Sequence, residues 1–206
     1  IKDIEKEIQP LFEEGQVANY IPALANVNPN QFAMSLQLFD GTSHHVGDID
    51  TQFSIQSISK VYTFTLALHL YGKELYKNVG HEHSGNSFNS LVQLEYENGI
   101  PRNPFINAGA IVTTDLLMNT YKDETFSKVL EFIQNVCDDD SINYDKEVAF
   151  SEEEHGYRNL ALINMMKSFN NITNDTHNVI SDYFKHCSIS MTTKQLCRSM
   201  LFLANH

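Results

Sequence analysis

The sequence predicts an α+β protein, in which one β-hairpin near the N-terminus precedes a run of helices. Apolar and polar residues alternate over 32–38, and Asp40-Gly41, a dipeptide typical of tight turns, follows directly. From residue 57 onward the apolar residues recur every three to four positions, which is the helical period. The 206 residues suffice for one sizeable core. We therefore predict a single domain over 1–206, with a hairpin part at about 17–56 and a mainly helical part at about 57–206.

The N-terminal part begins with an amphipathic pattern that predicts a helix over 3–14, ending at Gly15. Residues 17–30 contain two prolines and are expected to form a loop, and 43–47 is the predicted return strand of the hairpin. A two-stranded hairpin is marginal by itself. The sequence shows no further clear strand, so either helices cover the hairpin or the missing strands lie after His206.

The helical part starts with a pattern that is apolar nearly all round, from Ser57 to Tyr71, and predicts a buried helix capped by Gly72. The segment 78–106 is rich in Gly, Asn, Ser and Pro and is predicted to be irregular, apart from a short helix over 88–97. Further helices are expected over 108–121, 124–137, 157–169, 175–186 and 193–205, the last capped by Thr192 or Thr193.

Charge and composition exclude several classes of partner. The formal net charge is −12, from 26 acidic against 14 basic residues, so phosphate backbones and anionic lipids are repelled and neither a nucleic acid nor a membrane is expected as a partner. No apolar stretch reaches the ~18 residues of a membrane span. Three widely spaced cysteines do not form a disulfide framework, which predicts a reducing, cytoplasmic location. The chain starts at Ile1 and not at Met, as expected of a trimmed chain or part of a longer protein.

The motif that can carry chemistry is Ser57-Ile58-Ser59-Lys60, at the start of the predicted buried helix. Three residues rise only ~4.5 Å along a helix and return close to the same face, so the Ser57 and Lys60 side chains can meet. A serine hydroxyl needs a base to become a nucleophile. Neutral Lys60 could be that base if burial lowered its pKa from ~10.4 toward ~7.

The spacing alone is weak evidence, because 16 Ser and 11 Lys give roughly one such pattern by chance. The alternative is that Lys60 extends along apolar surface to reach solvent. Its position in an apolar helix favours a chemical task, because burying an idle lysine is costly.

Other polar clusters point to solvated surface. His81-Glu82-His83 lacks a further ligand at a recognisable spacing, so no metal site is predicted. Glu95 and Glu97 do not share a helix face. Asp138–Asp140 is expected at a helix end or in a loop, and Glu152–Glu154 in the first turn of a helix. No glycine-rich phosphate loop is present, and no cofactor is expected.

Several blocks of this sequence, in order and over essentially the whole chain, resemble the bacterial glutaminase family. They are VANYIPALANVNP (17–29), FSIQSISKVYTFTLAL (53–68), SGNSFNSLVQLEYENGIPRNPFINAGAI (84–111), SEEEHGYRNLAL (151–162) and DYFKHCSISMT (182–192). The catalytic domain of that family is related to serine β-lactamases and penicillin-binding proteins. The resemblance implies a serine β-lactamase-like fold, hydrolysis of L-glutamine to L-glutamate and ammonia through an acyl-enzyme, and a homo-oligomer, commonly a tetramer.

The resemblance also assigns catalytic residues. Ser57 matches the family's nucleophile and Lys60 its base. Tyr20 matches a tyrosine that lines the pocket near the nucleophile, and Tyr183 one that helps to shuttle protons and contacts the substrate. By themselves, the two tyrosines could equally be core aromatics with satisfied hydroxyls.

Three further positions match residues that hold the substrate's α-amino and α-carboxylate groups. A carboxylate such as Glu152 suits an ammonium group, and the amides of Asn107 and Asn159 can serve the α-carboxylate. The residues alone leave other roles open: Asn107 could cap the helix at 108–121, and Asn159 could be a surface amide.

One departure from the family lies in the region beyond His206. The family has a further tyrosine, a K-S-G-type segment with the second oxyanion donor, and the last strands of the sheet in that region. The resemblance therefore implies roughly the first two-thirds of a glutaminase. Two alternatives stay open: another S-x-x-K acyl transferase of the β-lactamase type, or an inactive fragment that serves as a structural or oligomerisation unit.

Overall fold

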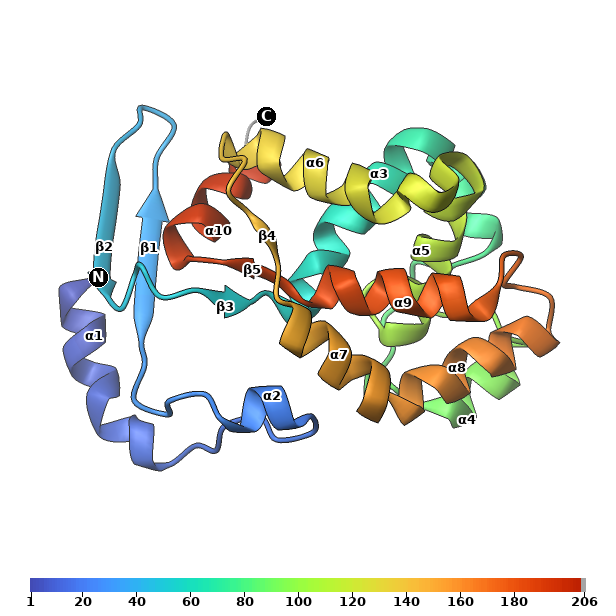
Figure 1. The fold of residues 1–206 in the computed structure, drawn as a ribbon, viewed down its shortest axis with the longest axis horizontal. Coiled ribbons are helices and arrows are strands. Elements are labelled where there is room, and N and C mark those ends of the chain that lie inside the picture. Colours follow the sequence, from blue (N-terminus) through green and yellow to red (C-terminus); the bar gives the residue numbers. More distant parts are fainter. Residues whose placement is uncertain (205–206) are drawn as a thin grey trace.

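The computed structural model describes residues 1–204 and has two parts (Figure 1). The N-terminal part consists of a hairpin with a short helix beside it, and a cluster of helices forms the rest. The N-terminal elements are α1 (Lys2–Ile8), a 3-10 turn (Gln9–Glu13), α2 (Pro22–Ala25), β1 (Ala33–Gln37) and β2 (Ser43–Gly47). The helix predicted over 3–14 changes to a 3-10 turn after Ile8, because Pro10 cannot continue an α-helix.

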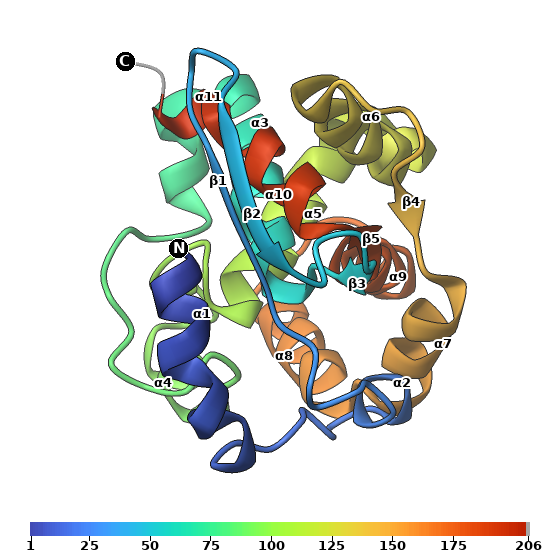
Figure 2. The ribbon, with the colours of Figure 1, turned by 90° about the vertical axis from the view of Figure 1, so that its left-hand side faces the viewer.

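The predicted hairpin is confirmed. Strands β1 and β2 are antiparallel, with Ala33 opposite Gly47 and Gln37 opposite Ser43. The turn between them is closed by the Asp40 carboxylate, which accepts the Thr42 N–H at 2.8 Å. Figure 2 shows the hairpin from the side, with α10 and α3 behind it.

The helical cluster is built around α5, which is buried along most of its length and packs against α3, α6, α8 and α9. Its sequence is apolar on nearly every face, as a central helix requires. The helices of the cluster are α3 (Ser59–Tyr71), α4 (Leu91–Tyr96), α5 (Asn107–Tyr121), α6 (Thr125–Cys137), α7 (Lys146–His155), α8 (Tyr157–Ser168), α9 (Thr176–Cys187), α10 (Thr193–Ser199) and α11 (Leu201–Ala204). Further 3-10 turns cover Gln56–Ile58, Gly72–Lys77 and Lys122–Glu124.

The prediction of no further strand is wrong. Three short strands, β3 (Phe53–Ser54), β4 (Asn143–Tyr144) and β5 (Ile189–Met191), form an antiparallel sheet in the order β3-β5-β4. Strands of two or three residues are too short to show an alternating pattern. The sheet positions the site, because the Ile55 N–H continues the pairing onto the carbonyl of Ile189 at 2.8 Å, just before Ser57.

Two helix predictions also need correction. Glu152–Glu154 lie near the end of α7 and not in a first turn, because the helix already starts at Lys146, where the Asp145 side chain caps it. The helix predicted over 193–205 is divided at Met200 into α10 and α11, and Asn205 lies outside the described residues. The predicted cap at Thr192 is confirmed, as part of a capping box with Gln195.

Candidate active site

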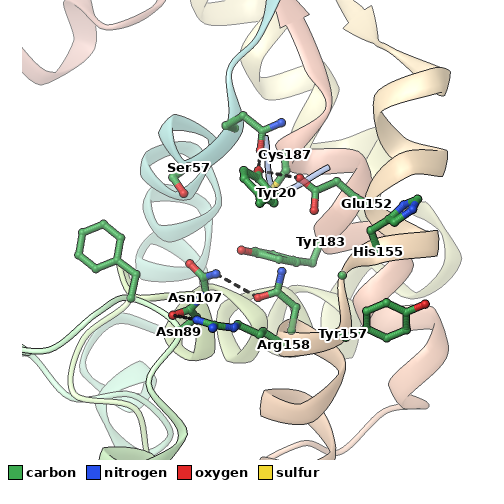
Figure 3. Close-up of a pocket in the computed structure, with 14 residues that line it drawn as sticks. Tyr20, Ser57, Asn89, Asn107, Glu152, His155, Tyr157, Arg158, Tyr183 and Cys187 are labelled. Carbon is green, nitrogen blue, oxygen red and sulfur yellow. Dashed lines mark hydrogen bonds between the residues drawn. The ribbon is translucent and has the colours of Figure 1, made fainter. Parts of the chain in front are cut away.

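A pocket of about 790 Å³ opens between the start of α3, the start of α5 and the helices α7, α8 and α9 (Figure 3). Its lining includes six of the seven residues that the sequence singled out; the exception is Lys60, which lies behind the wall. The six are Tyr20, Ser57, Asn107, Glu152, Asn159 and Tyr183. Residues far apart in the chain thus converge on one cavity, which is in the size range of small-molecule sites.

Ser57 lies in the 3-10 turn that precedes α3, slightly before the helix start that the sequence predicted. The preceding residue, Gln56, has a positive φ of 47°, which is uncommon for a residue with a side chain. The Gln56 carbonyl accepts the Ser59 hydroxyl at 2.7 Å and so fixes this turn. The Ser57 side chain is exposed to the pocket and makes no hydrogen bond within residues 1–204.

Lys60 is buried, with 2% of its surface exposed, so the alternative of a lysine that reaches solvent is wrong. Its Nζ donates to the Phe105 carbonyl at 3.1 Å and to Asn107 Oδ1 at 2.8 Å. Both acceptors are uncharged. Burial lowers the pKa of Lys60 to about 8, because desolvation disfavours the ammonium form. The amine is therefore neutral in an appreciable fraction of molecules near neutral pH.

The Asn107 amide connects Lys60 to the opposite wall. Asn107 is the first residue of α5 and makes no capping bond there, so the alternative of a helix cap is wrong. Its Oδ1 accepts from Lys60, and its Nδ2 donates to Asn159 Oδ1 at 3.0 Å. These bonds fix the orientation of both amides and place Asn159 in the pocket wall.

Glu152 forms the polar end of the pocket. It is 3% exposed, and its Oε1 lies 2.9 Å from the Tyr20 hydroxyl. The same hydroxyl lies 2.9 Å from Gln56 Oε1. Burial raises the pKa of Glu152, while hydrogen bonds from Tyr20 and Gln56 lower it in part. Desolvation and the nearby Glu152 raise the pKa of Tyr20, so its hydroxyl stays protonated as a donor.

Tyr183 comes from α9 and is buried against Cys187, one turn further along. Figure 3 shows its hydroxyl in the middle of the pocket, between the Ser57 side and the Glu152 side. Desolvation raises the pKa of Tyr183, so the hydroxyl is protonated. Tyr20 and Tyr183 are thus both pocket residues, and neither is only a core aromatic.

Sequence reasoning missed other residues of the lining. Gln56 adjoins Ser57 inside the S-x-x-K block, and Arg158 precedes Asn159, so sequence proximity to the predicted residues was the available signal. Phe88 comes from the irregular segment 78–106, and its ring centroid lies 5.3 Å from Lys60 Nζ. Asn89 accepts from the Arg158 guanidinium at 3.4 Å. Such a contact between distant segments has no local pattern.

Within residues 1–204, no group of His, Cys, Asp and Glu side chains could hold a metal ion. The helices in this part of the chain are too short or too polar to cross a membrane.

Fold and pocket together define a helix-rich α+β protein in which a serine lines a pocket of small-molecule size and a buried lysine lies one turn away, behind the pocket wall. The Glutaminase family model matches residues 15–206. The chain belongs to the glutaminase family.

Individual relatives agree with this assignment. A glutaminase of Aliarcobacter butzleri is 67% identical over the whole chain, which covers 68% of that relative. A glutaminase of Rhizobium johnstonii is 50% identical over 99% of the chain, which covers 66% of it. The solved structure of a probable glutaminase of Bacillus subtilis matches with a TM-score of 0.85 and 30% identity, over 97% of this chain and 61% of that one. The chain thus spans about two-thirds of the length of its curated relatives, and its α+β fold is that of glutaminases.

Proposed function

We propose that this chain is a single catalytic domain that hydrolyses L-glutamine to L-glutamate and ammonia through an acyl-enzyme on Ser57, with Lys60 as general base. The observation that carries the proposal is the state of Lys60, which is buried, bonded to two uncharged acceptors and one turn from a serine exposed to the pocket. Family membership supplies glutamine as the substrate.

The hydrogen bonds of Lys60 suit a base. A neutral amine has two N–H groups and one lone pair, and the Phe105 carbonyl and Asn107 Oδ1 account for both N–H groups. The lone pair is then left to take the proton of Ser57 as Oγ attacks the side-chain amide carbon of glutamine. Collapse of the tetrahedral intermediate breaks the C–N bond, and the Lys60 ammonium returns the proton to the leaving ammonia. Water then hydrolyses the ester to release glutamate.

The rest of the pocket fits the polar ends of glutamine. The Glu152 carboxylate is suited to the α-ammonium group, and the amides of Asn107 and Asn159 to the α-carboxylate. The hydroxyls of Tyr20 and Tyr183 are protonated donors that face the same space. The Ser57 backbone N–H supplies one donor for the oxyanion.

The test is ammonia release from glutamine by the chain and by a version extended to the length of its relatives. Ser57→Ala and Lys60→Ala are each expected to lower kcat/KM at least about a thousandfold without loss of fold. Ser87→Ala and Lys73→Ala, at exposed positions outside the pocket lining, are the matched controls. Turnover that survives Ser57→Ala would overturn the mechanism. Activity of the extended version alone would identify this chain as the inactive-fragment alternative, and covalent labelling by penicillin without ammonia release would favour the β-lactamase-type alternative.

We further propose a cytoplasmic homotetramer. Its support is the family assignment, the three free cysteines Cys137, Cys187 and Cys197, and large exposed side chains such as Tyr96 and Phe150. Sedimentation equilibrium on the extended chain tests the assembly, and a monomer at micromolar concentration would contradict it.

A further inference from the structure

A second, smaller hollow of about 380 Å³ is lined in part by Phe105, the residue whose carbonyl accepts Lys60 Nζ. Its walls include Phe64 from α3, Tyr76 from the following 3-10 turn, His81 and Glu82 from one chain segment, and Asn103 and Phe105 from another. It shares no lining residue with the 790 Å³ pocket.

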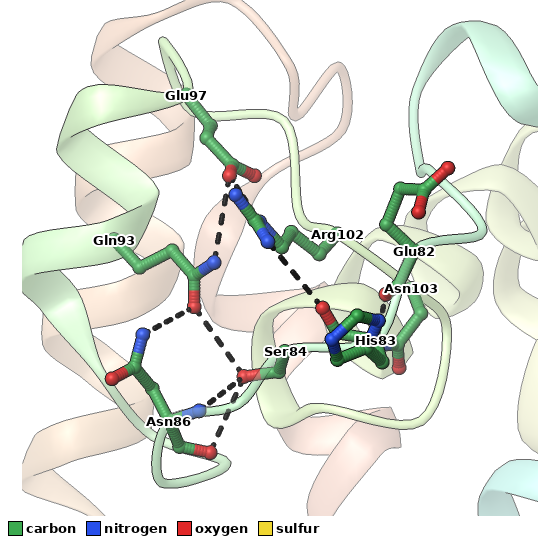
Figure 4. Close-up of polar contacts among 8 residues, drawn as sticks. All are labelled: Glu82, His83, Ser84, Asn86, Gln93, Glu97, Arg102 and Asn103. Atoms are coloured by element: carbon green, nitrogen blue, oxygen red, sulfur yellow. Dashed lines mark hydrogen bonds and ion pairs between the residues drawn. The ribbon is translucent and has the colours of Figure 1, made fainter.

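Hydrogen bonds between the two loop segments hold one wall of the hollow in place (Figure 4). The Glu82 N–H donates to the Arg102 carbonyl at 2.8 Å, and Asn103 Nδ2 donates to the Glu82 carbonyl at 2.8 Å. The Gly80 N–H donates to the Pro101 carbonyl at 2.8 Å. A Cβ on Gly80 would lie 2.7 Å from the Arg102 carbonyl oxygen, so only glycine permits this approach. The wall is therefore preformed.

The chemistry of the hollow favours a cation. The rings of Phe64 and Phe105 are 5.4 Å apart at 66°, which gives two steeply angled aromatic walls, and Tyr76 adds a third. Angled aromatic rings with a nearby carboxylate are the arrangement that recognises organic ammonium groups. Glu82 supplies that carboxylate. The neighbouring cations Lys77 and Arg102 are ion-paired elsewhere, with Glu74 and Glu97. His81 and His83 also line the hollow, and His81 Nε2 lies 3.8 Å from Glu82 Oε1.

We propose that this hollow is a second binding site, for a small organic ammonium ion, and that binding there changes the environment of Lys60. Its volume is ample for a tetramethylammonium-sized ion and lies in the lower range of small-molecule sites. Binding at this hollow does not require the proposed hydrolysis, so the binding experiment tests it independently of catalysis.

The link to Lys60 runs through the segment 103–107. The Phe105 side chain forms part of the hollow, while its carbonyl accepts Lys60 Nζ. Asn103, another wall residue, accepts the N–H groups of Phe105 and Ile106 with its Oδ1, at 3.0 and 3.2 Å. Asn107, the second acceptor of Lys60, follows directly. A ligand that contacts Asn103 and Phe105 therefore touches the segment that carries both acceptors of the lysine.

The experiment is an NMR titration of the isotopically labelled chain with tetramethylammonium, and with tert-butanol as a neutral isostere. With tetramethylammonium we expect saturable chemical-shift changes of the His81 ring and Phe105 signals. The affinity derived from these shifts is expected to be at least fivefold weaker in Glu82→Gln and in Tyr76→Leu than in the wild type. Glu13→Gln, which removes the same charge at an exposed position in the N-terminal turn, is expected to bind like the wild type.

The site is overturned if tetramethylammonium gives no saturable shifts, if Glu82→Gln leaves its affinity unchanged, or if tert-butanol binds equally well. The link to Lys60 is tested in the same titration, where the Lys60 Cε signals are expected to move along the same saturation curve. Stationary Lys60 signals at saturation would overturn that link.

Discussion

The Lys60 side chain shows how burial and neutral partners together set the chemistry of one residue. An ammonium group would be retained at this depth if a carboxylate faced it, because an opposite charge raises the pKa of a lysine. Its hydrogen-bond acceptors are instead a peptide carbonyl and an amide oxygen, so desolvation dominates and the pKa falls to about 8. The neutrality of Asn107 is thus as important as its position.

Asn107→Asp tests this directly. A carboxylate placed 2.8 Å from Lys60 Nζ is expected to raise the pKa of the lysine by about 1–3 units. Because the base must be deprotonated, kcat/KM should rise with pH through about 8 in the wild type, and this limb should move at least one unit higher in the variant. The measurement is a pH profile of ammonia release in the extended chain.

The control for this variant is Asn107→Ala, which removes the amide without adding charge. The alanine variant is expected to have a higher KM, while the pH at which its kcat/KM rises stays at or below that of the wild type. An Asn107→Asp profile with the midpoint of the wild type would contradict the electrostatic role of Asn107.

Residue identities in the site could be predicted, but their partners could not. The S-x-x-K spacing and the matching blocks indicate Ser57 and Lys60 from local sequence. The bond between Tyr20 and Glu152 joins residues 132 positions apart, and the Phe105 carbonyl that holds Lys60 is a backbone group, which no side-chain pattern reveals. Long-range packing creates these contacts, so they appear only in three dimensions.

The buried His186 side chain lowers the stability of the fold. It is 1% exposed on α9, both ring nitrogens lack a hydrogen-bond partner within residues 1–204, and its ring stacks on Phe126. Burial, with a smaller contribution from Lys185, lowers its pKa to about 3. The fold therefore holds the neutral imidazole, and protonation favours unfolding. Above about pH 6.5, the pKa of histidine in the unfolded chain, the free energy of unfolding does not depend on the protonation of this residue. Between pH 6.5 and about 3 it falls by about 1.4 kcal/mol per pH unit.

His186→Phe is therefore expected to stabilise the chain by about 1 kcal/mol at pH 7.5, because it removes unsatisfied polar atoms and keeps the stacked ring. At pH 5 the advantage should grow by about 2 kcal/mol, because the wild type then loses proton-linked stability. Urea unfolding at the two pH values measures both quantities. The exposed His177→Phe should show no such growth, and equal differences at both pH values would contradict the burial argument.

At the level of elements, the long helices could be predicted from the sequence, whereas the short strands and the start of α7 could not. The long periodic segments of α3, α5, α6 and α9 carry their own signal over three or more turns. Strands β3, β4 and β5 do not, because their two or three residues are defined by pairing with one another. Helix α7 was missed in its first half because Asp145 caps it in a stretch whose acidic residues suggested a later start.

Asp115 joins two of these elements. This buried carboxylate on α5 accepts the N–H groups of Thr173 and Asn174 at 3.0 and 2.9 Å, together with the Thr173 hydroxyl at 2.9 Å. It thereby fixes the connection between α8, which carries Asn159, and α9, which carries Tyr183. Several charge-assisted hydrogen bonds to one buried carboxylate together stabilise this connection.

Asp115→Asn is expected to destabilise the chain by about 3 kcal/mol, because an amide N–H₂ would face backbone donors that need an acceptor. Amides of 173–176 should lose hydrogen-exchange protection before those of α5. Asp123→Asn, at an exposed position in the next turn, should change stability by less than about 0.5 kcal/mol. Unfolding curves and exchange rates of the two variants give the comparison, and matching results for both would rule out the anchoring role.

For the whole molecule, self-association depends on the balance between a strong negative charge and an apolar two-stranded hairpin. The net charge of −12 makes copies of the chain repel one another. Against this, Leu36, Leu38 and Phe39 on the β1–β2 hairpin are 45%, 43% and 64% exposed, and within residues 1–204 no third strand pairs with that sheet. Open strand edges with apolar side chains are templates for pairing with another copy.

Salt should decide between these two effects, because the screening length falls from about 10 Å at 0.1 M to about 3 Å at 1 M, while apolar contacts persist. We expect the weight-average mass in sedimentation velocity to rise with concentration in 1 M NaCl and much less at 0.05 M. Leu36→Lys with Phe39→Lys should suppress the rise at high salt, where charge repulsion is screened, because the apolar contact itself is lost. Leu11→Lys, an exposed apolar position in the N-terminal turn, should not suppress it. High-salt association that persists in the double variant would place the contact on another surface, away from the hairpin.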